Sequence, residues 1–302
     1  MRHTDMAETE HQNFLAWTSI KQTQVEQVLN QLLPSEQLTP HTLHSAMRYS
    51  ALGGGKRVRA LLCYAAAELC NTALATANAA AAAVELIHAY SLVHDDMPCM
   101  DDDDLRRGKP SCHKQYDEAT ALLVGDSLQT LAFEILSQPG LSNSGTQINM
   151  VNILAKASGT SGMAGGQAID LSAVGKALDQ SELEYMHRLK TGALIKAAVL
   201  LGAIGGSDAH IAAVSQYAER MGLAFQVVDD ILDVEADSTT LGKTAGKDAE
   251  NNKPTYVSIL GLTAAKQHAQ QLYQEALVAL SPFGDQAKHL RLLADFIMQR
   301  SF

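Results

Sequence analysis

Two clusters of aspartates are the residues whose type and spacing could carry chemistry in this chain. In the first, six aspartates fall within the ten residues from Asp95 to Asp104, and Arg106 and Arg107 follow closely. Carboxylate oxygens without histidine or cysteine partners suit Mg²⁺ or Mn²⁺. An apolar, alanine-rich segment leads into this run, so its carboxylates need to be paired, neutralised or bound to a metal. The cluster therefore predicts an ion site rather than a solvated tail.

The second cluster contains Gln226, Asp229, Asp230 and Asp233. In a helix these side chains fall within about 100° of arc, and apolar residues occupy the rest of the circumference. Such a polar stripe favours the lining of an internal cavity, because the apolar remainder must be buried on its other sides. A structural ion-pair network is the alternative interpretation.

The helix that precedes the first cluster has to position it. A step of about 100° per residue places His88 and Asp95 roughly 20° apart on one face. A satisfied core histidine is the ordinary interpretation of His88, but this alignment favours a shared cavity. Pro98 should end the helix. Asp95 and Asp101 can therefore share an ion only if the segment from Met97 to Met100 bulges.

Two further segments bring cations. Three glycines, Gly53 to Gly55, precede a basic run, so the backbone can approach a ligand closely and the charges suit phosphate. A solvated basic turn is the alternative. The polar loop from Ser238 to Pro254 is typical of a linker, yet its place after the second acidic cluster suggests a lid that brings lysines over bound anions. These features together predict an apolar pocket that ends in a site for a Mg-bound diphosphate.

Composition excludes several classes of protein. The net charge of −10 argues against nucleic-acid binding. Four cysteines without metal-ligand spacing predict free thiols in a reducing compartment, and the polar first ten residues lack a signal peptide. The run from Ala73 to Val93 is the one membrane-span candidate, and a buried helix is favoured because Glu85 and His88 interrupt it. We therefore expect a cytoplasmic protein without stable membrane insertion.

Abundant alanine and few aromatic residues favour helices over sheets. We find no convincing strand and no internal repeat, and we expect one all-α domain over residues 1–302. Helical patterns are predicted over 12–33, 40–52, 60–69, 73–94, 119–136, 148–159, 182–201, 225–233, 264–280 and 288–300.

The motifs resemble those of the trans-prenyltransferase family, the short-chain isoprenyl diphosphate synthases. The aspartate-rich segments match in the pattern Asp95-Asp96-x4-Asp101 and Asp229-Asp230-x2-Asp233. Further motifs follow in the family's order, namely Gly55-Lys56-x2-Arg59, His88, Arg106-Arg107-Gly108, Gly166-Gln167-x2-Asp170, Lys190-Thr191 and Phe225-Gln226. The two-residue insertion that includes Pro98 is similar to that of the bacterial farnesyl-type members.

The resemblance implies an all-α, isoprenoid-synthase-type helical bundle around a deep central cavity, and a homodimer. It implies Mg-dependent, head-to-tail condensation of isopentenyl diphosphate with dimethylallyl or geranyl diphosphate to give farnesyl diphosphate. Three Mg²⁺ ions are expected, or Mn²⁺ in their place, on Asp95, Asp101 and Asp229, with Asp96, Asp102 and Asp233 as secondary ligands. The allylic diphosphate is expected to meet Arg106, Lys190 and Lys253, and isopentenyl diphosphate to meet Lys56, Arg59, His88 and Arg107. Thr191 and Gln226 are expected near the carbocation.

Product length is expected to depend on the helix before Asp95. Ser91, four residues earlier, shares the face of Asp95, and Tyr90 is the large residue beside it. In the family, an aromatic residue at this position is typical of farnesyl-length synthases. A geranylgeranyl diphosphate synthase is the alternative. A terpene cyclase, or a non-catalytic subunit of a heteromeric synthase, is less well supported because both aspartate motifs and the basic loop are present.

Overall fold

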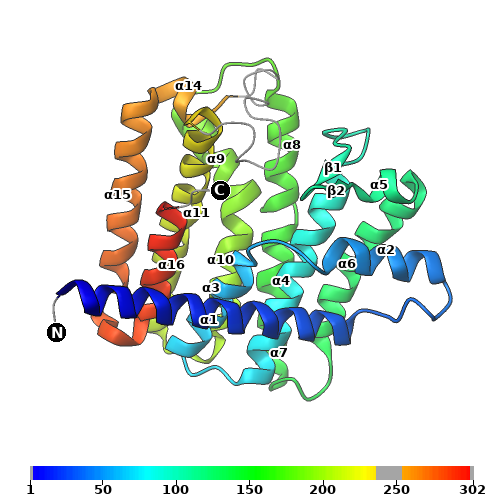
Figure 1. Cartoon of the computed structure of the whole chain (residues 1–302), viewed down its shortest axis with the longest axis horizontal. Coiled ribbons are helices and arrows are strands. Elements are labelled where there is room, and N and C mark those ends of the chain that lie inside the picture. The colour runs from blue at the N-terminus through cyan, green and yellow to red at the C-terminus, as the bar shows by residue number, and fades with distance from the viewer. Residues whose placement is uncertain (1–2, 236–253, 300–302) are drawn as a thin grey trace.

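The computed structural model describes residues 3–235 and 254–299, and this part of the chain is built almost entirely of helices (Figure 1). The first half contains α1 (His3–Leu32), α2 (His41–Ala51), α3 (Val58–Leu69), α4 (Leu74–Asp95), α5 (Cys112–Gln115), α6 (Glu118–Ser137) and α7 (Ser144–Ser158). The second half contains α8 (Met163–Ala173), α9 (Gln180–His187), the π-helix η1 (Arg188–Gly192), α10 (Ala193–Gly202), the 3₁₀-helix η2 (Ala203–Gly205), α11 (Asp208–Glu235), α14 (Tyr256–Leu260), α15 (Leu262–Leu280), the 3₁₀-helix η3 (Ser281–Ala287) and α16 (Lys288–Met298). The predicted all-α fold is confirmed.

The longer helices from α3 onward form an upright bundle, and α1 crosses its front face (Figure 1). Within the bundle α4 packs on α3, α6 and α10, while α11 packs on α10, α15 and α16. The C-terminal end of α4 and the short helix α14 lie toward the same end of the bundle. The first acidic cluster and helix α14 thus lie at one end of the bundle.

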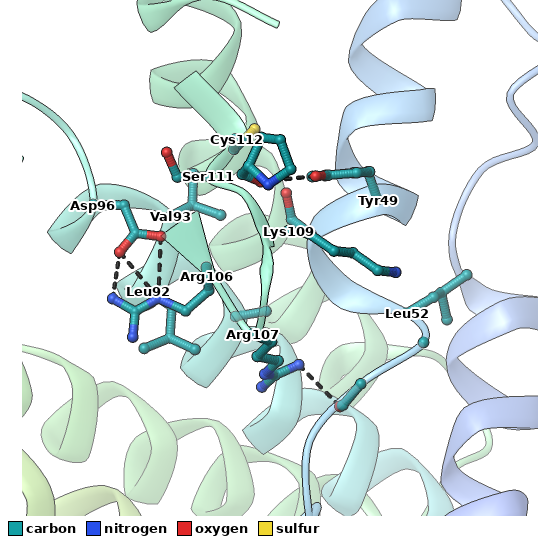
Figure 2. Close-up of a pocket in the computed structure, with 15 residues that line it drawn as sticks. Tyr49, Leu52, Leu92, Val93, Asp96, Arg106, Arg107, Lys109, Ser111 and Cys112 are labelled. Atoms are coloured by element: carbon teal, nitrogen blue, oxygen red, sulfur yellow. Dashed lines mark hydrogen bonds and ion pairs between the residues drawn. The ribbon is translucent and has the colours of Figure 1, made fainter. Parts of the chain in front are cut away.

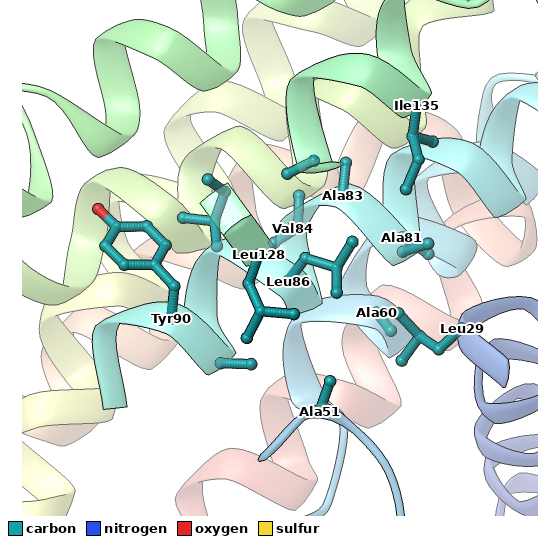
Figure 3. Close-up of a cluster of buried hydrophobic side chains, with 14 of the residues drawn as sticks. Leu29, Ala51, Ala60, Ala81, Ala83, Val84, Leu86, Tyr90, Leu128 and Ile135 are labelled. Carbon is teal, nitrogen blue, oxygen red and sulfur yellow. The ribbon is translucent and has the colours of Figure 1, made fainter. Parts of the chain in front are cut away.

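Helix α4 lies inside the bundle because its sequence offers no polar face. The run from Ala79 to Ala83 is buried all round, and Val84, Leu86 and Ile87 are fully buried as well. A helix that is apolar on every side is stable only when neighbours surround it, and the small alanines let those neighbours approach closely. Figure 3 shows Leu86 beside Leu128 of α6, with Tyr90 further along α4. The helix that leads to the acidic cluster is therefore held on all sides.

Two details of the secondary structure differ from the sequence-based expectations. A two-stranded antiparallel hairpin is present, in which β1 (Leu105–Arg106) pairs with β2 (Lys109–Pro110). Its turn residues Arg107 and Gly108 have φ of 53° and 73°, which suits a two-residue type I′ turn. The single helix predicted over 182–201 is divided into α9, η1 and α10, so Lys190 and Thr191 lie on a π-turn. Such turns are frequent at functional sites.

The membrane-span candidate is also different from the one expected. Helix α4 is buried in the bundle, whereas α6 is the one helix among residues 3–235 and 254–299 that is long and apolar enough to span a membrane, with a mean hydropathy of 1.3. Within α6, 39% of the most apolar 18-residue stretch is buried. Its outward face includes Leu122 and Leu123, which are 49% and 53% exposed. The predicted lid, 238–254, lies outside the described residues except for Pro254.

Candidate active site

The predicted bulge after α4 is present. The helix ends at Asp95, and the chain then turns so that the Asp101 amide donates to the Asp95 carbonyl at 2.9 Å. A second backbone bond joins the Asp103 amide to the Asp96 carbonyl at 3.1 Å. Pro98 cannot continue the helix, and this folded turn brings Asp101 back beside Asp95. The two carboxylates expected to share an ion are therefore neighbours despite their separation of six residues.

A cavity of about 400 Å³ begins at this turn. Helix α4 contributes His88 and Asp95 to its wall, and η1 contributes Lys190 and Thr191. Other predicted residues that line it are Arg59, Tyr90 and Ser91, and α8 adds Met163, Gln167 and Leu171. The volume lies within the range of about 300–1,000 Å³ that is usual for small-molecule pockets. The shared cavity expected for His88 and Asp95 is confirmed.

The ionisable groups of this cavity are strongly perturbed. Burial, opposed by Lys190 and reinforced by Asp101, raises the pKa of the Asp95 carboxyl to about 6. Burial and then the positive charge of Arg59 hold the pKa of His88 well below its usual range, so the ring is neutral. The Asp95 carboxyl is costly to ionise unless a cation is near, and the Asp101 carboxyl lies next to it. A divalent metal would stabilise the ionised form of such a pair.

The remaining members of the first cluster have different partners. Asp96 is buried and accepts from the guanidinium of Arg106 on β1 (Figure 2), whose Nε lies 3.0 Å from Asp96 Oδ1. Asp103 lies 3.7 Å from the same guanidinium. Asp102 is exposed and instead approaches Asp104 and His113, with one ligand atom of each within 4.8 Å of the others. The six aspartates are therefore unequal.

The hairpin connects this cluster to the glycine-rich loop. Arg107 donates from Nη1 to the Gly54 carbonyl at 2.9 Å, as Figure 2 shows, while Tyr49 of α2 donates to the Pro110 carbonyl at 2.7 Å. A Cβ on Gly54 or Gly55 would lie 3.1 or 2.9 Å from the Arg107 guanidinium. The glycines thus leave the space that this side chain occupies. A pocket of about 70 Å³ lies beside the hairpin, lined by Arg106, Arg107 and Lys109.

A buried ion-pair network positions the basic loop, and the sequence-based analysis did not single it out. Arg57 adopts a left-handed conformation (φ 51°) and donates to Glu85 of α4 at 3.1 Å and to Glu26 of α1 at 2.6 Å. Glu85 is 2% exposed and also accepts from the Ala60 amide at 3.0 Å. Burial alone would lower the pKa of Arg57, and these carboxylates raise it above its usual value. Lys56 and Arg59 flank this anchored residue.

Polar groups of η1, α8 and α11 meet on the opposite wall. Lys190 donates to Asp170 of α8 at 2.6 Å, and Thr191 donates from Oγ1 to Gln226 Oε1 at 3.3 Å. The buried amide of Gln167 has no hydrogen-bond partner within the described part of the chain. Because Gln167 lines the cavity, its amide is available to a ligand.

The second acidic cluster lies on the last turns of α11. Asp229 and Asp233 are half-buried, whereas Asp230 is 3% exposed and accepts from the Tyr256 amide of α14 at 2.8 Å. The polar stripe is therefore divided between Gln226, which faces η1, and Asp230, which faces α14. Lys253 lies outside the described residues.

These features match a known family. The model of a protein family described as "Polyprenyl synthetase" matches residues 40–289. This span contains both acidic clusters and the basic loop. The chain belongs to the polyprenyl synthetase family. Members of this family are prenyltransferases, and the all-α fold and the deep cavity are those of a prenyltransferase.

Individual relatives of this polyprenyl synthetase agree with the family. The farnesyl diphosphate synthase of Escherichia coli (strain K12) is 51% identical over 264 residues, which cover 84% of this chain and 88% of that protein. A solved FPP/GFPP synthase from Zymomonas mobilis, in the apo form, is 40% identical with a TM-score of 0.86 and covers 95% of this chain and 99% of that one. A geranyltransferase from Helicobacter pylori, complexed with magnesium and isoprenyl diphosphate, is 34% identical with a TM-score of 0.78 and covers 92% and 95%.

Proposed function

We propose that this polyprenyl synthetase condenses isopentenyl diphosphate with dimethylallyl diphosphate and then with geranyl diphosphate, releasing farnesyl diphosphate. The observation that carries the proposal is one cavity with Asp95 and Lys190 at one end and Tyr90 in its wall. Charged groups that suit a diphosphate are thus joined to a space that suits an isoprenoid chain. The relatives at about half identity include a farnesyl diphosphate synthase, which supports the same product.

The donor set fits magnesium. Asp95, Asp101 and Asp229 offer only carboxylate oxygens, and hard oxygen ligands are those that Mg²⁺ prefers. Asp233 and Asp102 are secondary candidates, whereas the Arg106 guanidinium occupies Asp96. We expect three Mg²⁺ ions per active site, and Mn²⁺ is able to take their place. When bound, the metal supplies positive charge that stabilises a departing diphosphate.

The first chemical step breaks the bond between the allylic carbon and its diphosphate oxygen, and the electron pair leaves with the diphosphate. We assign the binding of that leaving group to Lys190 and Arg106, with Lys253 as a third cation. Preorganised charges aimed at developing charge are the largest catalytic contribution in many enzymes. The Thr191 hydroxyl and the Gln226 amide oxygen offer partial negative charge to the allylic cation. Met163 and Leu171 give the same cavity an apolar lining that suits the isoprenoid chain.

The second step forms a carbon–carbon bond. The double bond of isopentenyl diphosphate attacks the allylic cation, and the resulting cation loses a proton to the released diphosphate. We assign the diphosphate of this substrate to Lys56, Arg59 and Arg107, with neutral His88 as a hydrogen-bonding partner. Arg57, held by Glu85, fixes the loop that carries Lys56 and the start of α3 that carries Arg59. With these assignments, the substrate that ionises and the substrate that stays intact have separate diphosphate sites.

The product leaves at fifteen carbons because of Tyr90. Its side chain is 8% exposed and lines the cavity next to Ser91. Ser91 is small enough to admit a ten-carbon primer, while the Tyr90 ring opposes deeper extension. A geranylgeranyl diphosphate synthase is the second candidate, and its longer product would require that this ring move aside.

We also propose that the protein is a homodimer in the cytoplasm. The exposed leucines of α6 and the exposed Ile148 of α7 offer an apolar surface that suits a second copy of this chain. All four cysteines are free, which suits a reducing compartment. Sedimentation equilibrium of the purified protein tests the dimer, and a single species of monomer mass would contradict it.

One assay tests the reaction. The purified protein is incubated with Mg²⁺, isopentenyl diphosphate and either dimethylallyl or geranyl diphosphate, and both diphosphate release and the dephosphorylated products are measured. We expect release only when both substrates are present, with farnesol as the main alcohol after dephosphorylation. Release from an allylic substrate alone would instead indicate a cyclase. No release would indicate a non-catalytic subunit.

A further inference from the structure

Asp230 differs from its neighbours in the second acidic cluster by its burial. Its carboxyl is 3% exposed, and Asp229 and Asp233 are only half-buried. Each oxygen of Asp230 accepts a hydrogen bond. Gln226 donates from Nε2 to Oδ1 at 2.9 Å, and the Tyr256 amide donates to Oδ2 at 2.8 Å. A buried carboxylate with two donors aimed at it is held in one place.

The bond from Gln226 determines which end of its amide reaches the reaction site. The amide presents its NH₂ group, which can only donate, to the Oδ1 atom of Asp230. The carbonyl oxygen is then directed the other way, where Thr191 donates to it at 3.3 Å. Thr191 lines the large cavity. The carboxylate therefore keeps the negative end of the amide dipole on the side of Thr191, a residue of the cavity wall.

The other partner of Asp230 is equally well fixed. Tyr256 is fully buried, and its ring stacks on His187 at 5.6 Å between centroids. Thr255, immediately before it, forms a capping box with Ser258 at the start of α14. Since α14 is anchored in this way, its backbone amide holds Asp230 against the turn of α11 that carries Gln226. The carboxylate connects a packed element to the amide that contacts Thr191 of the cavity wall.

We propose that Asp230 is a positioning residue that orients the Gln226 amide toward the carbocation, rather than a ligand of the metal. This inference rests on the proposed function, because it assumes that the Gln226 oxygen faces a cationic intermediate. It gives the two adjacent aspartates different roles. Asp229 is left for the metal, while Asp230 acts through Gln226 on the rate of the chemical step.

The replacement Asp230→Asn separates these roles. An asparagine can accept from the Tyr256 amide, but it then presents an NH₂ group to Gln226. The Gln226 amide must then rotate to offer its oxygen to that group. This rotation turns the Gln226 NH₂ group toward the cavity, so that the positive end of the amide dipole faces the cation. We expect kcat with geranyl diphosphate to fall about tenfold or more, which is about 1.4 kcal/mol. The Mg²⁺ concentration for half-maximal rate should stay within about twofold of wild type.

The exchange Gln226→Glu with Asp230→Asn provides a rescue. The introduced asparagine again accepts from the Tyr256 amide and now donates to the introduced glutamate, whose second carboxylate oxygen faces Thr191. Every hydrogen bond of the wild-type arrangement is replaced, so this double variant should fold. We expect the kcat of the double variant to be at least about threefold higher than that of Asp230→Asn, although each single variant is impaired. Gln226→Glu alone places two carboxylates against each other and should be the least stable of the three.

Asp229→Asn is the matched control, because it removes the adjacent carboxylate without touching Gln226. We expect it to raise the half-maximal Mg²⁺ concentration about tenfold or more. The inference fails if Asp230→Asn shifts the Mg²⁺ requirement as Asp229→Asn does, or if the double variant recovers no activity while its melting temperature matches wild type. If wild-type protein makes no prenyl product at all, the proposed function fails instead, and the two failures are distinct.

Discussion

The ring of Tyr90 meets the ring of His94 edge-on, with 5.8 Å between the centroids and 78° between the planes. His94 is fixed in turn by a hydrogen bond of 3.0 Å from its Nε2 to the Leu122 carbonyl of α6. Burial raises the pKa of the Tyr90 hydroxyl, and Gln129 of the same helix opposes that rise. The residue that we assign to product length is therefore held by α6 as well as by its own helix.

Tyr90→Ala should lengthen the product. Removal of the ring extends the cavity past the level of Ser91, so a farnesyl chain can remain and accept another five-carbon unit. Chromatography of the dephosphorylated products should then show twenty-carbon material. Tyr185→Ala is a matched control, because Tyr185 is 56% exposed and does not line the cavity. No material beyond fifteen carbons in the Tyr90 variant would contradict the assignment.

Ser91→Phe should shorten the product to ten carbons. Ser91 lines the cavity four residues before Asp95, so a phenyl ring there fills the space that a geranyl chain needs. With dimethylallyl diphosphate as primer, we expect geraniol as the main alcohol and little use of geranyl diphosphate. Ser91→Ala adds no volume and serves as the control, with a fifteen-carbon product. The assignment would be wrong if the phenylalanine variant kept its wild-type product length.

Gly125→Ala should disturb both stability and product length. A Cβ at Gly125 would lie 1.9 Å from His94 Nε2, so the imidazole must leave the position that supports Tyr90. Overpacking of this kind costs about 1–3 kcal/mol, and we expect a lower melting temperature together with some twenty-carbon product. Gly145→Ala is the control, because its nearest neighbouring atom lies at 3.4 Å. If the Gly125 variant kept wild-type stability and product length, His94 would not be the residue that supports the Tyr90 ring.

Much of the cavity could be predicted from the sequence because it depends on local periodicity. His88 and Asp95 lie seven residues apart on one helix, so the helical repeat alone brought them to one face. The ending of α4 before Pro98 followed from the missing amide of proline. The alanine run indicated a helix that had to be buried. These inferences needed no knowledge of distant contacts.

The rest depended on contacts between distant segments. Nothing local to Glu85 indicates that Arg57, 28 residues earlier, would be its partner across α3 and α4. The different burial of Asp229 and Asp230 was also invisible, because both lie in one stripe and the Tyr256 amide of α14 contacts Asp230. The hairpin could have been suspected from Gly108, since a turn of this type needs positive φ at both central residues. Its two-residue strands, however, show no alternation of apolar and polar residues.

Glu85→Gln should weaken binding of isopentenyl diphosphate selectively. The glutamine oxygen can still accept from the Ala60 amide, but its NH₂ group then faces the Arg57 guanidinium and repels it. Loss of this anchor releases the loop that carries Lys56 and loosens the first turn of α3, which carries Arg59. We expect KM for isopentenyl diphosphate to rise about tenfold, equivalent to about 1.4 kcal/mol. The KM for geranyl diphosphate should change by less than about twofold.

A surface ion pair provides the control for this change. Arg220 and Glu275 lie 2.8 Å apart and are both more than a third exposed, so Glu275→Gln should alter neither KM. Equal effects of Glu85→Gln on both substrates would mean that the network supports the fold in general. The selective role of Glu85 would then have to be abandoned.

His187→Phe should remove part of the protein's sensitivity to acid. The imidazole is 7% exposed, neither ring nitrogen has a hydrogen-bond partner in residues 3–235 and 254–299, and burial lowers its pKa to about 4. The unfolded chain binds this proton near pH 6.5, so stability is lost as the pH falls from about 6.5 to about 4. Once the loss is complete, the free energy of unfolding is lower by about 3 kcal/mol. Phenylalanine keeps the stacking on Tyr256 without a titrating group.

Melting temperatures between pH 7.5 and 4.5 check this prediction. We expect the His187→Phe curve to fall less steeply than wild type, and the difference between them to grow as the pH decreases. His210→Phe is the matched control, because His210 also stacks on an aromatic ring, that of Phe283 at 4.6 Å, but its Nδ1 is paired with Ser207. It should keep the wild-type slope. Parallel curves for wild type and the His187 variant would show that another buried group causes the loss in acid.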